Sequence, residues 1–383
     1  MDINQFPMDV EQINAKQHIM NGEKFNYKIK PDSVVILVQV HDRLDILKMQ
    51  LESFRTNRYI NETLLVVSHD YYSKPVFDII DSIDFCPVLQ IFYPYPIQAY
   101  NKMFPGDDPN DCPRDLSLDE ARKRKCNNAE FPDRYQHYRE AKHTQLKHHW
   151  LWKLQFVFER SFFKDVPGVT ILRLDDDYYL AADALDMIKK MNVARDAECR
   201  DCKMFIMGGM ENTSPQPYRA QSGDVNRGYW YAGVGRGQAF TKDFWKLLKD
   251  CQKAFCLFDD CNWDWALQHV TATCIPGGLK ILKPSASRLF HLGKCKGFHR
   301  NMSCTTESVK QEADHILKTN SQYLFPAKVQ VVGNFPNRPT HDVPYGGWTD
   351  IRDHELCFKI YNNKTLNQKD LSGIHQLLFR KNG

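Results

Sequence analysis

The chain has no long hydrophobic run. None of its apolar stretches approaches about 18 residues, the length that a membrane-spanning helix needs, so the sequence predicts no transmembrane segment. Internal repeats and low-complexity tracts are lacking as well, which excludes repeat architectures. Charge of one sign is not in excess, because 51 basic residues stand against 47 acidic ones. This balance gives no reason to expect nucleic acid as a partner.

A signal-peptide pattern is also missing, because the start Met1-Asp2-Ile3-Asn4-Gln5 is polar and acidic. Cysteine, in contrast, is abundant, with 12 residues. Four glycosylation sequons begin at Asn61, Asn212, Asn301 and Asn363. Cysteines and sequons together favour a secretory-pathway lumen with several disulfides. A lumenal protein needs a targeting segment, so either that segment lies outside this chain or the compartment prediction is wrong.

Strand and helix patterns alternate along the chain. Buried strands are predicted at 33–40, 63–67, 87–92, 169–174, 204–207 and 279–282. Helices are predicted at 44–54, 75–83, 138–161, 181–191, 241–254 and 264–270. This alternation indicates βαβ units in an α/β fold with a mostly parallel sheet. Residues 1–30 are interpreted as a polar lead-in, 209–230 as a loop, and the part after about 300 as loop-rich.

Three consecutive carboxylates, Asp175, Asp176 and Asp177, follow the predicted strand 169–174. Adjacent negative charges repel unless a cation or solvent offsets them. Ligands of open α/β sheets bind beyond the carboxyl ends of the strands, so a divalent metal holding an anionic ligand is one interpretation. A solvated acidic turn before a helix is the other, and these residues alone do not separate the two.

Two more sets of polar side chains follow predicted strands. Gln39, His41, Asp42 and Arg43 come at the end of the first strand. His69 and Asp70 follow the second strand, where Asp70 could bind a base or ribose while Arg43 pairs with a phosphate. Each could equally be a turn residue, but the ends of parallel strands meet at one edge of a sheet.

Histidines and tryptophans supply the other candidates. His148 and His149 are consecutive on a helix and point about 100° apart, so they make a poor metal pair. His291 follows a short predicted strand and could complete an oxygen-rich Mn²⁺ site, although a structural role is the commoner one. Asp264 lies between Trp263 and Trp265, where it is either a general base in an apolar cleft or a first-turn helix residue.

Several long motifs resemble one family. They are Val38-Gln-Val-His-Asp-Arg43, Ser68-His-Asp70, Phe85-Cys-Pro-Val-Leu-Gln90, Asp111-Cys-Pro-Arg-Asp115, His137-Tyr-Arg-Glu-Ala-Lys142, Lys147-His-His-Trp150, Asn262-Trp-Asp-Trp265 and the run from Gly346 to Cys357. These segments are similar to the N-acetylglucosaminyltransferase II family (glycosyltransferase family 16) over about residues 33–357. Members of this family transfer GlcNAc in β1,2 linkage to the α1,6-arm mannose of N-glycans in the Golgi.

The resemblance implies a GT-A fold in one catalytic domain over 31–383, with a nucleotide-sugar half at about 31–200 and an acceptor half at about 201–360. It implies Mn²⁺ held by Asp177 and His291, Asp264 as the catalytic base, and a UDP-GlcNAc donor. The implied donor-binding residues are Gln39, Val40, His41, Asp42, Arg43, Asp70, Gln145, Leu146, Lys147, His148, His149 and Asp176. Trp263, Trp265 and Asp259 are expected to bind the acceptor.

The resemblance also implies the disulfides Cys112–Cys126, Cys199–Cys202, Cys251–Cys274, Cys256–Cys357 and Cys295–Cys304. Membrane attachment is expected only through an anchor that this sequence does not contain. The family usually has Glu-Glu-Asp where this chain has 175–177, and His where it has Tyr178. Residues 204–236 match poorly, which makes the acceptor arm less certain than the donor. The alternatives are a transferase for the α1,3-arm mannose, a non-catalytic lumenal protein that binds nucleotide sugars or glycans and, from another class, a metal phosphoesterase.

Overall fold

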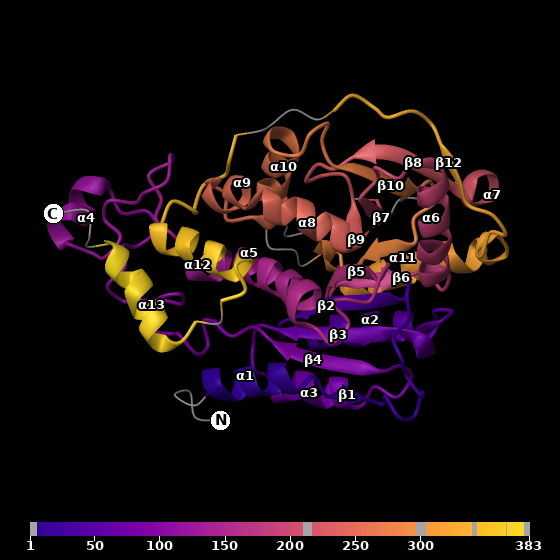
Figure 1. The fold of residues 1–383 in the computed structure, drawn as a ribbon, viewed down its shortest axis with the longest axis horizontal. Helices are drawn as coiled ribbons and strands as arrows, with labels where there is room; N and C mark the ends of the chain where they lie inside the picture. The colour runs from indigo at the N-terminus through magenta and orange to yellow at the C-terminus, as the bar shows by residue number, and fades with distance from the viewer. Residues whose placement is uncertain (1–5, 210–216, 296–303, 339–342, 365, 379–383) are drawn as a thin grey trace.

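A twisted sheet of ten strands forms the centre of the molecule in the computed structural model (Figure 1). The structure describes all residues except 1–5, 210–216, 296–303, 339–342, 365 and 379–383. The strands are β1 Ile19–Met20, β2 Val34–Val40, β3 Leu64–His69, β4 Val88–Phe92, β5 Thr170–Asp175, β6 Tyr178–Leu180, β7 Met204–Gly208, β8 Asp224–Tyr229, β9 Arg236–Phe240, β10 Lys280–Pro284, β11 Leu289–His291 and β12 Gln330–Val332.

The sheet order is β1-β4-β3-β2-β5-β9-β7-β10-β8-β12. Strands β4, β3, β2 and β5 are parallel to one another, while β9 is antiparallel to both β5 and β7. Strands β6 and β11 form a separate two-stranded antiparallel ribbon. The expected α/β class, a Rossmann-like sheet flanked by helices, is thus confirmed, with its parallel strands concentrated in the first half.

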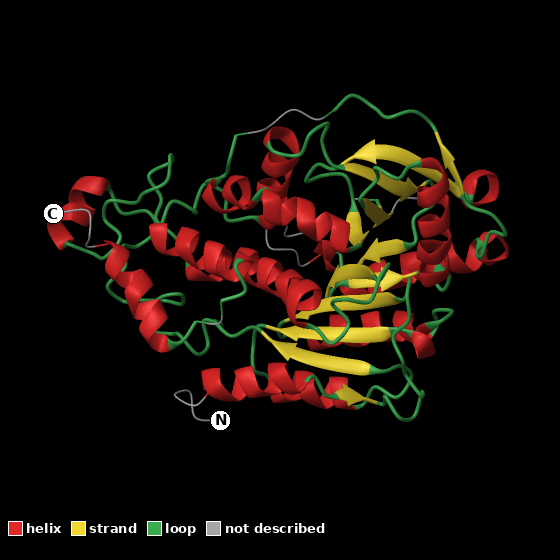
Figure 2. Ribbon diagram, viewed as in Figure 1, coloured by secondary structure: helices red, strands yellow, loops and turns green. Residues whose placement is uncertain are grey.

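Helices cover both faces of the sheet (Figure 2). They are α1 Phe6–Lys16, α2 Leu44–Arg55, α3 Lys74–Asp81, α4 Leu118–Arg124, α5 Ala141–Gln155, α6 Ala184–Glu198, α7 Tyr218–Gln221, α8 Lys242–Asp250, α9 Gln252–Leu257, α10 Trp263–Thr273, α11 Thr306–Thr319, α12 Ile351–Tyr361 and α13 Gln368–His375. No helix in the described part of the chain is both long enough and apolar enough to span a membrane.

The residues of strand β2 contribute to two hydrophobic cores, one on each face of the sheet. Val35 and Leu37 pack with the apolar residues of α5, α8, α9, α10 and α12. Val34 and Ile36 pack on the other face with α2, α3 and α6. Successive side chains of a strand point to opposite faces, so a continuous apolar run is what a strand buried between two helical layers requires.

Three predictions about local structure were wrong. The lead-in contains α1, which is polar and attaches to β4 because Asn14 donates to the Phe92 carbonyl at 2.7 Å and accepts from its amide at 2.8 Å. The expected loop at 209–230 contains α7 and the largely polar strand β8, which pairs with β10. The part after 300 is less loop-rich than expected, because it carries α11, α12 and α13.

Three predicted helices also differ in the structure. The helix expected at 138–161 is α5, Ala141–Gln155, followed by one π-helical turn at Phe156–Arg160. Helix α6 begins at Ala184 rather than 181, because Tyr178–Leu180 form β6 and pair with β11. The predicted helix 241–254 is divided into α8 and α9 at Cys251. Cys251 is bonded to Cys274, at the end of α10. The disulfide therefore attaches the junction between α8 and α9 to α10.

Four of the five implied disulfides are confirmed. They are Cys112–Cys126, Cys199–Cys202, Cys251–Cys274 and Cys256–Cys357. Cys304 is also disulfide-bonded, but the side chain of its expected partner Cys295 lies outside the described residues, so that pairing stays a prediction. Cys86 and Cys261, which belong to none of the five implied disulfides, are free thiols. The bonded cysteines agree with an oxidising compartment.

Candidate functional site

The ends of β2, β3 and β5 lie side by side, so the polar residues that follow them meet. Gln39 is paired with Ser68 on one side and with Asp175 on the other. Asp70 is the centre of the first contact group: its carboxylate lies 2.6 Å from Nδ1 of His41 and 3.1 Å from Nδ1 of His149. The predicted meeting of polar residues at this edge of the sheet is therefore found.

These contacts keep Asp70 ionised although it is buried. Burial alone would raise the pKa of Asp70, but the hydrogen bonds from His149 and His41 outweigh burial and hold it well below its ordinary value. His149 is buried too, and desolvation lowers its pKa to about 4. His41 is half-exposed, and its hydrogen bond to Asp70 raises its pKa. A fixed negative charge thus lies directly behind an accessible imidazole.

The three carboxylates of the acidic run have separate partners. Asp175 accepts from the guanidinium of Arg173 and, at 3.0 Å, from the hydroxyl of Tyr178. Arg43 bonds to Asp176 with one nitrogen and to Asp177 with the other, the latter at 2.9 Å. The run is therefore neither a fully solvated turn nor a set of three equivalent ligands.

The electrostatics of Asp176 and Asp177 differ as well. Burial raises the pKa of Asp176 to about 6, against the opposing effect of Arg43. For Asp177, burial is outweighed by the hydrogen bonds and charges of His291 and Arg43, so its pKa lies well below its ordinary value. Asp177 is accordingly the carboxylate that stays ionised.

His291 reaches Asp177 through the small ribbon of β6 and β11. In this ribbon His291 is paired with Tyr178, the residue directly after Asp177. The amide of Leu292 donates to the Asp177 carbonyl at 2.8 Å, and Nε2 of His291 lies 3.2 Å from Oδ2 of Asp177. Two residues 114 positions apart in sequence are thus brought into contact by strand pairing.

The surroundings of this pair suit a divalent cation. A Cβ atom on Gly293 would lie 2.9 Å from Nε2 of His291 and closer still to Oδ2 of Asp177, so only glycine leaves that space open. One carboxylate oxygen and one imidazole nitrogen are ligands that Mn²⁺ and similar ions accept. The residues present therefore fit a metal ion held between Asp177 and His291.

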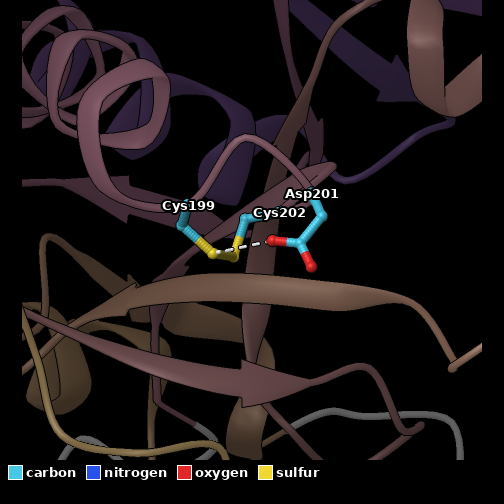
Figure 3. Close-up of side chains that lie close together, drawn as sticks. All are labelled: Cys199, Asp201 and Cys202. Atoms are coloured by element: carbon cyan, nitrogen blue, oxygen red, sulfur yellow. Dashed lines mark hydrogen bonds between the residues drawn. A yellow bond between two sulfur atoms is a disulfide. The ribbon is translucent and has the colours of Figure 1, made fainter.

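Another group in the described residues has metal-ligand spacing, Cys199, Asp201 and Cys202 (Figure 3). Its two sulfur atoms are bonded to each other, and Asp201 forms an ion pair with Lys280. Disulfide sulfur is not a thiolate ligand. The group therefore joins the end of α6 to β7, as the expected structural disulfide.

The residues of α5 that were predicted to bind the sugar donor contact different parts of the molecule. The amide of Ile97 donates to Gln145 at 2.7 Å, and the side chain of Leu146 is exposed. His149 points to the strand ends, where it also lies 2.7 Å from the Ser68 hydroxyl. His148 points elsewhere, 3.0 Å from Asp353. The expectation that the two histidines face different directions is confirmed, although both are buried.

Lys147 supports the segment that carries Asp264. Its Nζ atom donates to the Asp260 carbonyl at 2.8 Å and lies 3.9 Å from the centroid of a Trp348 ring. Burial lowers the pKa of Lys147 to about 7.

Among the remaining residues predicted to bind the donor, Val40 is buried in the core and Asp42 is exposed. A buried Val40 side chain leaves only its backbone for a ligand.

Asp264 lies in the first turn of α10. Its carboxylate accepts from the Trp265 amide at 3.0 Å. Burial raises its pKa to about 6, with smaller opposing effects from hydrogen bonding. Trp263 stacks on Trp150 with centroids 4.9 Å apart, and Trp265 meets Tyr345 edge-on at 5.1 Å. A carboxylate with this pKa between aromatic side chains can accept a proton near neutral pH.

The residues before Asp264 are attached to the segment 345–348. Asp259 accepts from the Trp348 amide at 3.0 Å, and Asp260 accepts from the Tyr345 amide at 2.9 Å. A single bridge pairs Asp260 with Gly346. Asp259, which was predicted to bind the acceptor sugar, therefore holds the segment 345–348 in place in this structure.

Sequence reasoning missed several residues of the site. Arg173 is a charged residue within an otherwise apolar strand. Because a charge is costly to bury without a partner, its place in the strand was a signal that it has a specific contact. Gly293 stands two residues after His291, but its need for space appears only in the structure. Lys153 is fully buried and bonds to Gln39, and only its place in the motif-rich stretch of α5 could have indicated it.

The comparisons with known proteins now decide the family. The family model of N-acetylglucosaminyltransferase II (MGAT2) matches residues 8–357. The chain therefore belongs to the N-acetylglucosaminyltransferase II family. The α1,6-mannosyl-glycoprotein 2-β-N-acetylglucosaminyltransferase of Sus scrofa is 40% identical over 350 residues, which cover 91% of this chain and 77% of that protein. The Arabidopsis thaliana protein of the same name is 29% identical, with 85% and 74% covered.

Two solved structures are also similar to this member of the N-acetylglucosaminyltransferase II family. S. aureus TarS 1–349 aligns over 92% of both chains with a TM-score of 0.34 and 9% identity. The mannosyltransferase PcManGT from Pyrobaculum calidifontis, in complex with GDP-Man and Mn²⁺, aligns over 84% of this chain and 81% of its own, with a TM-score of 0.30 and 8% identity. Family membership rests on the sequence matches.

Proposed function

We propose that this chain transfers GlcNAc from UDP-GlcNAc to the 2-hydroxyl of the α1,6-arm mannose of N-glycans, forming a β1,2 linkage. The observation that carries the proposal is the family match over residues 8–357, which includes Asp177, Asp264 and His291. Relatives at about 40% identity bear the name of this activity. We propose the lumen of the Golgi as its location, which the disulfides support.

The donor would bind at the carboxyl ends of β2, β3 and β5. Arg43 would exchange its contacts with Asp176 and Asp177 for the diphosphate, since a guanidinium pairs well with phosphate oxygens. Asp70 and His41 would hold the nucleoside. Asp177 and His291 would hold Mn²⁺, which would supply positive charge against the departing diphosphate. Gln145 to His149 would shape the same pocket from α5.

Asp264 would act as the general base. An α-linked donor and a β-linked product require inversion, so a single displacement with one carboxylate is enough. Asp264 accepts the proton of the mannose 2-hydroxyl while that oxygen bonds to the anomeric carbon and UDP leaves with the electron pair of the broken bond. Trp263, Trp265 and Asp259 would bind the acceptor sugar. General-base assistance of this kind is worth about 10²–10⁴ in rate.

The test is an incubation with UDP-GlcNAc, Mn²⁺ and an N-glycan that already carries GlcNAc on its α1,3 arm. We expect one added GlcNAc on the α1,6 arm, loss of transfer in EDTA, and recovery with Mn²⁺. Addition to the α1,3-arm mannose of an unmodified core would show the alternative arm specificity. Binding of UDP without any transfer would contradict the enzyme assignment and favour a non-catalytic binding protein.

A further inference from the structure

Arg173 is a buried cation that contacts both the acidic run and the segment of the base. It lies on β5 with 1% of its surface exposed. One guanidinium nitrogen donates to Gln238 at 3.0 Å, and another bonds to Asp175. Its guanidinium carbon lies 4.5 Å from the centroid of the Trp263 ring. The mechanism above gives Arg173 no part, although a buried charge is costly to retain.

Trp263 is held between Arg173 and α5. On the α5 side its ring is nearly parallel to that of Trp150, with an interplanar angle of 7°. On the β5 side the guanidinium supplies a cation–π contact, which is worth about 2 kcal/mol when it is desolvated. Trp263 and Asp264 are consecutive residues in the first turn of α10. Whatever fixes the ring of Trp263 therefore also fixes the backbone from which the Asp264 side chain projects.

Arg173 also acts on the charge of Asp264. Two charged side chains affect this carboxylate: Asp260, from the segment before α10, and Arg173, from β5. Burial is the largest influence and raises the pKa of Asp264; the hydrogen bond from the Trp265 amide lowers it, Asp260 raises it, and the charge of Arg173 lowers it by a smaller amount. Charges interact strongly where water is largely excluded. Arg173 thus acts together with the backbone hydrogen bonds against burial and Asp260, the two influences that favour a protonated, inactive base.

We propose that Arg173 is a positioning residue for the general base: its guanidinium fixes the ring of Trp263 and with it the backbone from which Asp264 projects. The inference rests on the proposed function, because it concerns the same transfer step. Arg173 lies on β5, the strand that leads into the acidic run, and it also bonds to Asp175. The same side chain therefore links the acidic run to the segment that carries Asp264.

The test compares the pH profiles of kcat for Arg173→Met and Arg173→Lys with that of the wild type, at saturating UDP-GlcNAc and acceptor. For Arg173→Met we expect the acid limb to move to higher pH, by less than one unit, because a cation that lowers the pKa of Asp264 is removed while the hydrogen bond from the Trp265 amide, which lowers it more, remains. Turnover at pH 6 should fall by about tenfold or more, since positioning is lost as well. Arg173→Lys keeps the charge, so its acid limb should stay in place while kcat falls several-fold.

Arg352→Lys is the matched control. Arg352 is a buried arginine that pairs with Asp350 and lies 5.0 Å from the centroid of the Phe104 ring, so this change has a similar structural cost. An acid limb that does not move in Arg173→Met, or moves equally in Arg352→Lys, overturns the inference. If Arg173→Met does not fold, Arg173→Lys decides: a kcat several-fold below that of Arg352→Lys supports the role, and an equal kcat overturns it. A wild type that transfers no GlcNAc contradicts the proposed function itself, whereas a transferring wild type with unaffected Arg173 variants overturns this inference alone.

Discussion

The edge of the sheet that would bind the donor and the segment that carries Asp264, the proposed base, are held in place differently. At the donor edge, β2, β3 and β5 are adjacent parallel strands, and the polar residues follow directly where each strand ends. The base segment is instead a loop and the first turn of α10. Asp264 depends on the side chains of Asp259 and Asp260, which accept hydrogen bonds from the Trp348 and Tyr345 amides, and on disulfides that join α9 to α12 and α8 to α10.

This difference separates two properties of the site. Strand ends are fixed by the ladder of the sheet, so the donor edge should tolerate changes elsewhere in the chain. The position of Asp264 depends on contacts with residues distant in sequence, so this position should be disturbed more easily by changes elsewhere in the chain. We therefore expect changes near 256–264 and 345–348, and loss of the Cys256–Cys357 disulfide, to lower transfer more than UDP affinity, and changes at 175–177 and 291–293 to lower both.

The largest expected effect is on stability, from removing the disulfide between α9 and α12. Cys256 and Cys357 are 101 residues apart, and the loop-closure relation gives about 4.7 kcal/mol for such a loop. The double variant Cys256→Ala/Cys357→Ala should unfold at lower denaturant and lose transfer before UDP binding. The pair Cys199→Ala/Cys202→Ala, with a separation of 3, is the control and should cost about 1.6 kcal/mol. Equal losses from both pairs would contradict this account.

The next effect is expected from Asp177→Asn. The change removes the charge that faces both His291 and Arg43, and a bound metal contributes several kcal/mol to stabilising developing charge. Transfer should fall at least about 10²-fold, and the effect of Mn²⁺ on UDP affinity should disappear. Calorimetric titration of UDP with and without Mn²⁺ measures the second part. Mn²⁺-dependent UDP binding that persists in the variant would remove Asp177 as a ligand.

A smaller effect is expected from Gly293→Ala. The added methyl group would enter the space beside Asp177 and His291, so Mn²⁺ affinity should fall about tenfold, which corresponds to about 1.4 kcal/mol. Gly373→Ala on α13 is the control, because its Cβ would meet nothing within 4 Å, and alanine there favours the helix. Electron paramagnetic resonance of Mn²⁺ measures both affinities. Unchanged binding in the Gly293 variant would place the metal elsewhere.

The smallest effect concerns pH. The base must be deprotonated to act, and burial raises the pKa of Asp264 to about 6. Turnover should therefore be lost as pH falls through about 6, reaching roughly half its plateau there. The kcat profile between pH 5 and 8 checks this prediction, with UDP affinity measured at each pH. A turnover that stays constant down to pH 5 would show that another group accepts the proton.

The same contrast explains what the sequence could predict. Strands β2 to β5, and the meeting of Gln39, Asp70 and Asp175, follow from local apolar runs and the geometry of parallel sheets. The pairing of Asp177 with His291 does not, because it depends on the ribbon of β6 and β11, whose strands are three residues long. Short polar pairings of this kind leave no periodic signal. Only the family resemblance indicated that pair before the structure did.

Helix α11 was missed for another reason. Its sequence carried signals: Val309, Ala313 and Ile316 are spaced along one helical face, and Thr305 and Ser308 form a capping box. Such a box usually has Glu or Gln at the third helical position, so a serine there is a weak signal. Helix α1 carried a weaker signal, since its attachment depends mainly on polar side chains: Asn14 bonds to β4 and Glu11 pairs with Arg160.

The separation of donor binding from proton removal is tested most directly in Asp264→Asn, by measuring UDP affinity and GlcNAc transfer on the same preparation. Asparagine keeps the size of the side chain and can still accept from the Trp265 amide, but it cannot take up the proton. We predict a UDP affinity within about twofold of the wild type and transfer at least about 10²-fold lower. Near-normal transfer, or an equal loss of both properties, would contradict the account.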